Sequence, residues 1–490
     1  MSSEPGSPAP EPGDRADGTN HDETNQAAPS DAATSTDAGG STNAGGSADA
    51  AGSTTSGDAA AGGPPDVAAN GLSTSDSGPT APRRQLPNWL MRTVRWLTSA
   101  NPFMITVLSI FSALVIGAIL IVIGDRPVMS TFSYFFARPS TALSGAWQQI
   151  RIAYTNLFEG AVFNPSTVGA AINGTATWEQ ALRPISETLT YAAPLILTGL
   201  AVAFAFRGGL FNIGAQGQAV FGVIGAGLVG LAIKLPVGLH FIVALIAGAI
   251  AGAAWGFIPG FLKARTGAHE VIVTIMMNYI ALLFLGWLIL QRGVKDPKQF
   301  NAISKPLHDS ATLPPILGSS LRTNVGLIVG LLMTFVIAWL INRSTLGFEV
   351  RAVGLNPDAA RTAGMSVGRT FIFVMVIAGA LGGLGGAVQL LGTASAVTGQ
   401  VTGNVGFDGI TVALLGRGKP WGVVLAALLF GALYAGGNQM QSNAGVVIDL
   451  VQVLQALIVI FIAAPALIAS IYRLRPVQGA QATANLAKGW

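Results

Sequence analysis

The sequence predicts an all-α fold: a polytopic membrane helical bundle of about ten transmembrane helices, preceded by a disordered N-terminal tail. Hydrophobic residues make up 51% of the 490 residues and charged residues only 10%, whereas soluble chains carry about 25% charge. Apolar windows long enough to cross about 30 Å of hydrocarbon recur from residue 104 onward. The 62 glycines suit close helix packing in lipid. These observations argue against a soluble enzyme.

Residues 1–82 form an acidic tail in which Ala, Gly, Ser, Thr, Asp and Pro dominate. The tail holds 12 acids and one base, so the remaining residues hold 11 acids and 26 bases. This composition cannot bury enough apolar surface to offset the entropy of the chain, and we predict disorder. A solvated spacer is favoured over a partner-binding tail. No signal peptide precedes the first apolar segment, which we expect to be an uncleaved span.

The body of the chain divides into a basic juxtamembrane segment (83–103), a transmembrane domain (104–472) and a C-terminal tail (473–490). The transmembrane domain contains nine windows of spanning length and a shorter apolar segment at 406–416, which at 11 residues resembles a half-helix. The nine windows lie at about 104–124, 188–206, 210–232, 236–262, 268–290, 324–342, 371–391, 420–437 and 447–470.

The basic residues predict the orientation of the chain. With ten crossings and the N-terminus inside, 16 Lys and Arg fall in about 80 cytoplasmic positions and 10 in about 122 external positions. If the 406–416 segment did not cross, Arg473 and Arg475 would lie outside. We therefore expect a multi-pass protein of the plasma membrane with both termini in the cytoplasm, surrounded by lipid.

Glycines at four-residue spacing occur in two of the windows. Small residues at this spacing let helix backbones approach closely, so these faces should be buried against neighbouring helices. The glycines are Gly248, Gly252 and Gly256 in one window, and Gly379, Gly382, Gly383 and Gly386 in another.

The sequence lacks the usual signals of catalysis. No phosphate-binding loop of the G-x-x-x-x-G-K-[ST] type occurs, so this chain should not hydrolyse ATP itself. Cysteine is absent and the four histidines are scattered, which leaves a metal site without support. We expect no catalytic residues, no cofactor, no metal and no nucleic acid partner.

Amide side chains are the more suggestive polar groups in the membrane domain. Asn212, Gln216 and Gln218 lie in a glycine-broken stretch that enters the third window, and Asn278 lies in the fifth. Such amides can line the path of a small polar solute, but they can equally tie helices together. We favour the second interpretation about two to one and keep the first as an alternative.

The loop from Arg343 to Thr370 carries signals for its own helix. Asn356 can cap, Pro357 suits the first helical position, and Gly364 can adopt the left-handed conformation at the end. The loop thus predicts a helix of about seven residues, too short to be stable in water without a surface to dock on. Its surface could be another protein or the bundle of its own chain.

This loop, GFEVRAVGLNPDAARTAGM at 347–365, resembles the coupling loop of ABC-importer permeases of the branched-chain amino acid and ribose permease superfamily. Three further segments resemble the nucleoside and simple-sugar branch: ETLTYAAPLILTGL at 187–200, FRGGLFNIGAQGQ at 206–218 and EVIVTIMMNY at 270–279. FDGITVALLG at 407–416 is similar to a short-helix motif of the superfamily. That branch usually has Glu where Gln216 stands here.

The resemblance implies a permease that imports nucleosides, with simple sugars such as ribose or galactose as the alternative. It also implies three partners: an ABC ATPase subunit that uses the ATP, a second homologous permease, and an extracellular solute-binding lipoprotein. An ion-coupled secondary transporter or a channel is the alternative from another class. The residues expected to contact the ATPase are Arg351, Asn356, Pro357, Ala359, Ala360, Arg361 and Gly364, and those expected along the solute path are Asn212, Gln216, Gln218 and Asn278.

Overall fold

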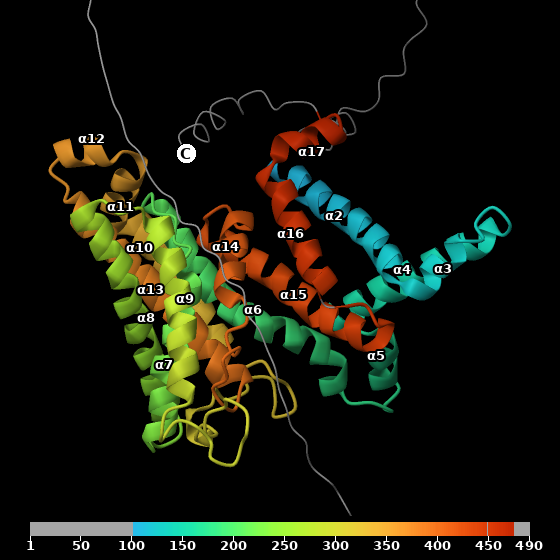
Figure 1. Ribbon diagram of the computed structural model, residues 1–490, viewed down its shortest axis with the longest axis horizontal. Helices are drawn as coiled ribbons and strands as arrows, with labels where there is room; N and C mark the ends of the chain where they lie inside the picture. Colours follow the sequence, from blue (N-terminus) through green and yellow to red (C-terminus); the bar gives the residue numbers. More distant parts are fainter. Residues whose placement is uncertain (1–100, 448, 475–490) are drawn as a thin grey trace, which may run out of the picture. The chain divides into compact units, whose positions relative to one another are not determined.

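The computed structural model describes residues 101–447 and 449–474 (Figure 1). Within these ranges the chain is helical and forms no β-strand beyond three isolated bridges. The prediction of an all-α membrane bundle is therefore confirmed. The predicted acidic tail, all but the end of the juxtamembrane segment and most of the C-terminal tail lie outside the described residues.

The helices differ widely in length, from long apolar rods to single turns. In chain order they are α2 (Pro102–Gly124), α3 (Arg126–Phe132), α4 (Pro139–Ala161), α5 (Pro165–Ile172), α6 (Trp178–Arg207), α7 (Ala215–Ala232), α8 (Leu239–Thr266), α9 (Glu270–Ile289), the 3₁₀ turn η1 (Asp309–Ala311), α10 (Gly326–Arg343), α11 (Thr345–Leu355), α12 (Pro357–Thr362), α13 (Val367–Thr393), α14 (Val405–Leu415), α15 (Pro420–Ala444), α16 (Asp449–Ala463) and α17 (Pro465–Ile471).

Among the described residues, eight helices are long and apolar enough to cross a membrane: α2, α6, α7, α8, α9, α10, α13 and α15. They match eight of the nine predicted windows. The ninth window, predicted as one continuous span at 447–470, is instead divided into α16 and α17, which meet at a bend of 89°. The break lies at Ala464 and Pro465, because proline has no N–H to continue a helix and its ring clashes with the preceding turn.

The chain from Val397 to Gly418, which includes the short apolar segment, runs from one end of the bundle to the other. Val397, which follows α13, donates its N–H to Ser304 Oγ at 2.8 Å, in the loop between α9 and α10. Gly418, which follows α14, accepts a hydrogen bond from Arg207 Nε at 3.2 Å, at the opposite end of α6. An irregular stretch and the 11-residue helix α14 therefore share one traversal. This arrangement agrees with about ten crossings, although α14 alone is too short for one.

The core forms where α13 packs against α6, α7 and α8. The predicted glycine faces lie at this junction: a Cβ built on Gly252 would lie 2.6 Å from Gly383 Cα, and one on Gly222 would meet the backbone of the same residue. No side chain fits at these contacts, so glycine lets three helices approach to backbone contact. The prediction that these faces are buried is confirmed.

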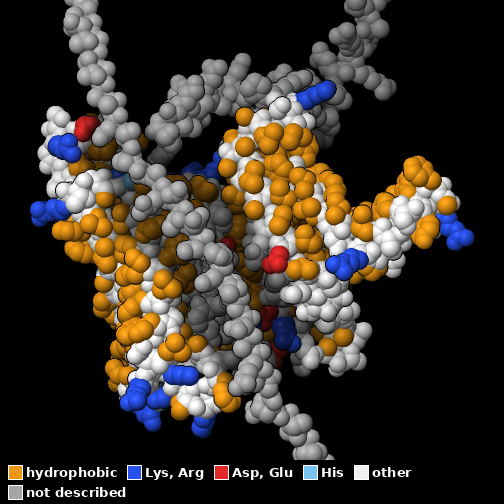
Figure 2. All heavy atoms as spheres, in the orientation of Figure 1, with side chains coloured by type: hydrophobic (Ala, Val, Ile, Leu, Met, Phe, Trp, Pro, Cys, Tyr) orange, Lys and Arg blue, Asp and Glu red, His pale blue; other side chains and the backbone are white. Residues whose placement is uncertain are grey.

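A second apolar cluster joins α2, α4, α15, α16 and α17. Helix α15 links the two parts, because it packs against both α6 and α4. The outer flanks are apolar as well: Figure 2 shows hydrophobic side chains along α8 and α9, with Lys and Arg gathered near the helix ends. Exposed large residues on these helices include Ile250, Leu283 and Trp287. The surface is that of a multi-pass membrane protein.

Candidate functional site

The loop between α10 and α13 folds into two consecutive helices, α11 and α12, which we call the elbow (residues 344–363). Ser344 caps α11 by accepting the N–H of Gly347 at 2.9 Å. The sequence indicated only the second helix of this loop. In Figure 1 the elbow lies at the upper left, and the loop between α9 and α10 lies at the bottom, at the opposite end of the helices.

Helix α12 is capped at both ends as predicted. Asn356 Oδ1 accepts the N–H groups of Asp358 and Ala359, each at 3.0 Å. At the other end Gly364 adopts φ of +83° and its N–H donates to Arg361 O at 3.0 Å, while Met365 N donates to Ala360 O at 3.0 Å. These two bonds form a Schellman motif. The helix has six residues, one fewer than expected.

One side of α12 docks on the bundle of its own chain. Ala360 is only 4% exposed and packs in a small cluster with Val353 and Val367. Arg351, also expected to contact another protein, donates from Nη1 to Ile341 O at 2.7 Å, at the end of α10. Both residues therefore hold the elbow on the bundle, and the prediction that they also contact a partner stays a prediction.

The other side of α12 is exposed. Asn356, Pro357, Ala359 and Gly364 are all exposed, and the side chain of Arg361 is 69% exposed while it pairs with Asp358 Oδ1 at 3.2 Å. Ion pairs at such exposure contribute little stability, so the guanidinium remains available to another acceptor. The elbow thus presents a short helix, α12, that is capped at both ends and carries the exposed charge of Arg361.

The four predicted amides are buried and are hydrogen-bonded in three separate sets. In the first, Asn212 Nδ2 donates to Gln218 Oε1 at 3.0 Å and the amide of Gln218 donates back at 3.3 Å. In the second set, Asn278 Oδ1 accepts the N–H of Gly217 at 2.8 Å and its Nδ2 donates to Ile213 O at 3.0 Å. The two bonds of Asn278 fasten the start of α7 to α9.

Gln216 fastens α7 to the start of α14. Its Nε2 donates to Gly403 O at 2.7 Å and to Thr402 Oγ1 at 3.2 Å, and its Oε1 accepts the N–H of Gly406 at 2.8 Å. The contacts of Gln216 and Asn278 match the helix-tying interpretation, whereas Asn212 and Gln218 bond to each other within one segment. The participation of all four amides in a solute path stays a prediction.

Replacing Gln216 with leucine should destabilise the protein. The change leaves Gly403 O and Gly406 N without their partner, and each unpaired buried group costs about 1–3 kcal/mol. We expect a lower midpoint of thermal aggregation in detergent, measured by fluorescence-detected size-exclusion chromatography. Gln291→Leu is the matched control, because the Gln291 side chain donates to Trp287 O, four residues earlier in the same segment, and this bond joins no second helix. Equal midpoints for the two variants would contradict the tying role.

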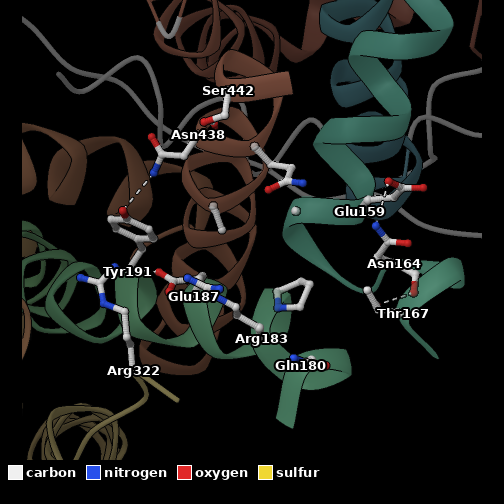
Figure 3. A pocket seen from close by; sticks show the side chains of 14 residues that line it. Glu159, Asn164, Thr167, Gln180, Arg183, Glu187, Tyr191, Arg322, Asn438 and Ser442 are labelled. Atoms are coloured by element: carbon white, nitrogen blue, oxygen red, sulfur yellow. Dashed lines mark hydrogen bonds and ion pairs between the residues drawn. The ribbon is translucent and has the colours of Figure 1, made fainter. Parts of the chain in front are cut away.

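A cavity of about 680 Å³ lies at the end of the bundle remote from the elbow. Figure 3 shows its walls: Glu187 and Tyr191 from α6, Asn438 and Ser442 from α15, Glu159 from α4, Asn164 and Thr167 at the start of α5, and Arg322 from the loop before α10. Eleven of the fourteen lining residues have polar side chains, which contrasts with the apolar body around them.

Polar contacts cross the cavity walls. Arg322 Nη1 pairs with Glu187 Oε2 at 3.0 Å, and Asn438 Nδ2 donates to the Tyr191 hydroxyl at 2.9 Å (Figure 3). On the opposite wall Asn164 Nδ2 donates to Glu159 Oε2 at 3.2 Å. Glu187 and Tyr191 lie in the segment 187–200 quoted above, but the sequence did not indicate that Arg322 and Asn438 would lie beside them.

The cavity connects to α14 through a second tyrosine. The rings of Tyr191 and Tyr434 stack with centroids 5.9 Å apart, and the Tyr434 hydroxyl donates to Asp408 Oδ2 at 2.8 Å. Asp408 lies in the first turn of α14. One ring contact and one hydrogen bond therefore link Tyr191 in the cavity wall to the first turn of the short helix.

The sequence model for the permease component of branched-chain amino acid transport systems matches residues 184–463, a range that includes both the elbow and most of the cavity wall. The chain belongs to this family. The matched range begins inside α6 and ends with α16, so α2 to α5 lie outside it. No solved structure matches this permease.

Three characterised relatives are similar to the permease. The guanosine ABC transporter permease NupP of Bacillus subtilis is 47% identical over 301 residues, which cover 60% of this chain and 83% of NupP. The glucose ABC transporter permease TsgB13 of Haloferax volcanii is 34% identical over 57% of this chain and 75% of its own length. A second guanosine permease of Bacillus subtilis, NupQ, is 30% identical over 50% of this chain and 79% of NupQ.

Proposed function

We propose that the chain is the permease subunit of an ABC importer that carries nucleosides across the plasma membrane, with both termini in the cytoplasm. The observation that carries this proposal is the 47% identity to the guanosine permease NupP over 83% of that protein's length. In this orientation the elbow faces the cytoplasm and the cavity faces the outside. The distribution of Lys and Arg along the sequence supports the same direction.

The elbow supports coupling to a separate ATPase chain. A six-residue helix is not stable alone in water, but here its caps and the buried Ala360 fix it while Arg361 remains exposed. ATP-driven movement of a partner bound to α12 would be transmitted to α10 and α13, the helices that precede and follow the elbow in the chain. We assign the exposed residues Asn356, Pro357, Ala359, Arg361 and Gly364 to that contact, and Arg351 and Ala360 to its support.

The partner permease is proposed to be a different chain. Bacillus subtilis has two guanosine permeases that resemble this chain to unequal degrees, 47% for NupP and 30% for NupQ. A transporter that contains one subunit similar to NupP and one similar to NupQ would explain why two such permeases occur together. An external solute-binding lipoprotein would deliver the solute to the cavity end of the pair.

Simple sugars are the second candidate, because the glucose permease TsgB13 is 34% identical. Amide and hydroxyl side chains form hydrogen bonds with the hydroxyl groups of sugars as well as with nucleosides, which favours this second candidate.

Guanosine uptake tests the proposed function. Cells that lack the gene should lose uptake of radiolabelled guanosine and regain it with the intact chain. Unlabelled uridine should compete, and ribose, galactose and glucose at the same concentration should compete at least tenfold less. Competition by a sugar but not by nucleosides would replace the proposal by the second candidate.

Energy dependence separates an ATP-driven importer from an ion-coupled transporter. In proteoliposomes that contain the complete transporter, uptake should require ATP and should persist when ionophores collapse the proton and sodium gradients. Uptake that follows an ion gradient without ATP would contradict the proposal.

A further inference from the structure

The cavity described above lies where a solute would enter the permease. Arg322 precedes α10 and Arg343 ends it, so the cavity and the elbow are separated by the full length of that helix. Helix α6 gives the same separation: Glu187 lines the cavity, whereas Arg207 reaches Gly418 at the other end. In the proposed orientation the cavity therefore opens toward the side on which the solute is delivered.

The size and lining of the cavity suit a small polar solute. Its volume of about 680 Å³ falls within the range of about 300–1,000 Å³ that is typical of small-molecule sites. Polar side chains from α4, α6 and α15 converge on it, in a part of the chain where burial of polar groups is costly unless they are paired or used.

The charges that line the cavity cancel. Two carboxylates, Glu159 and Glu187, face two guanidinium groups, Arg183 and Arg322, and Arg322 is already paired with Glu187 at 3.0 Å. A phosphorylated solute would have to break this pair or bring its charge into a site without net positive charge. The lining therefore favours an uncharged solute over a nucleotide.

Tyr191 and Asn438 offer two kinds of contact side by side. The tyrosine ring is an apolar planar face, and the amide holds both a donor and an acceptor. A nucleobase needs this combination, because its face stacks on an aromatic ring and its edge forms hydrogen bonds in the plane. The two side chains are joined at 2.9 Å, so a solute that contacts one lies within reach of the other.

We propose that this cavity is the site at which the permease binds the entering nucleoside, with the Tyr191 ring stacked on the base and the Asn438 amide bonded to its edge. The proposal rests on the proposed function and adds to it the binding residues and the preference for an uncharged solute. Binding there would displace Tyr191 against Tyr434, and so would reach Asp408 and α14.

The test uses the complete transporter, with its binding protein, in proteoliposomes, and measures guanosine uptake and ATP hydrolysis together. Stacking of a base on an aromatic ring contributes about 1–3 kcal/mol, so Tyr191→Leu should lower guanosine transported per ATP about tenfold. Tyr191→Phe keeps the ring and should stay within about threefold of the unmodified protein. Asn438→Leu should lower the ratio about fivefold. ATP hydrolysis stimulated by the binding protein should persist in all three.

The control is Tyr279→Leu, the same change at a ring that is 63% exposed on the outer face of α9, which should leave the ratio unchanged. An unchanged ratio in Tyr191→Leu, or an equal loss in the Phe and Leu variants, would overturn the proposal. Failure of the unmodified transporter to move guanosine would overturn the proposed function instead.

If the variants do not assemble, photolabelling of the unmodified transporter with 8-azidoguanosine tests whether the nucleoside binds in this cavity. Label on the peptides that contain Tyr191 or Asn438 supports the site. Label confined to other segments of the permease, or its absence from the permease, overturns it.

Discussion

Arg361→Glu should abolish stable association of the permease with its ATPase. The side chain is 69% exposed at the tip of the elbow, and loss of a charged central contact in an interface commonly costs 2 kcal/mol or more, which is about 30-fold in affinity. Reversal adds repulsion next to Asp358. We expect at least a tenfold drop in ATPase recovered with the affinity-purified permease, and a parallel loss of uptake.

Two comparisons separate contact from stability. Arg361→Gln removes the charge but leaves a good helix former, so it should give a partial loss without melting α12. Arg292→Glu makes the same reversal at an exposed position of the opposite end of the bundle, where no ATPase should bind. Full ATPase recovery with a well-folded Arg361→Glu protein would remove the elbow from the coupling interface.

Gly383→Leu should prevent formation of the folded bundle. A Cβ at this position would lie 2.9 Å from Gly252 Cα and 3.1 Å from Gly252 N, both backbone atoms that cannot move aside without separating α8 from α13. Overpacking a fitted core costs about 1–3 kcal/mol even where side chains can adjust, and here only backbone is available to shift. We expect the monodisperse peak in fluorescence-detected size-exclusion chromatography to disappear.

Gly286→Leu is the matched control within the membrane. A Cβ on Gly286, in α9, meets no atom within 4 Å, so the larger side chain should extend into lipid. This variant should keep the peak and the uptake of the unmodified protein. A stable Gly383→Leu protein would mean that the close approach of α8 and α13 is not required for folding.

Features encoded by neighbouring residues could be predicted from the sequence. The caps of α12 lie within eight positions of each other, from Asn356 to Gly364, and each acts through bonds to its own turn. The glycine spacing of α8 and α13 likewise predicted which faces are buried. The sequence of the loop does not indicate that Ala360 faces the bundle. That contact depends on where Val353 and Val367 lie after folding.

The cavity could not be predicted for a different reason. Two of its three pairs are distant in sequence: Glu187 and Arg322 are 135 positions apart, and Tyr191 and Asn438 are 247 apart. Part of its wall belongs to α4 and α5, which are not continuous apolar windows. The bend after α16 did carry a signal, Pro465, but prolines are a weak guide here, since Pro184 and Pro194 lie inside the unbroken helix α6.

Helix α6 runs without a break for 30 residues, which corresponds to about 45 Å at 1.5 Å per residue. Its N-terminal half supplies Glu187 and Tyr191, and just beyond its C-terminal end the backbone of Gly209 lies against Gly354 of the elbow, where a Cβ would be 3.0 Å from Gly354 Cα. One rigid rod thus touches both faces of the protein. A small tilt imposed at its C-terminal end must also swing its N-terminal half, so under the proposed function the stroke of the ATPase and the fit around the cargo would change in the same instant.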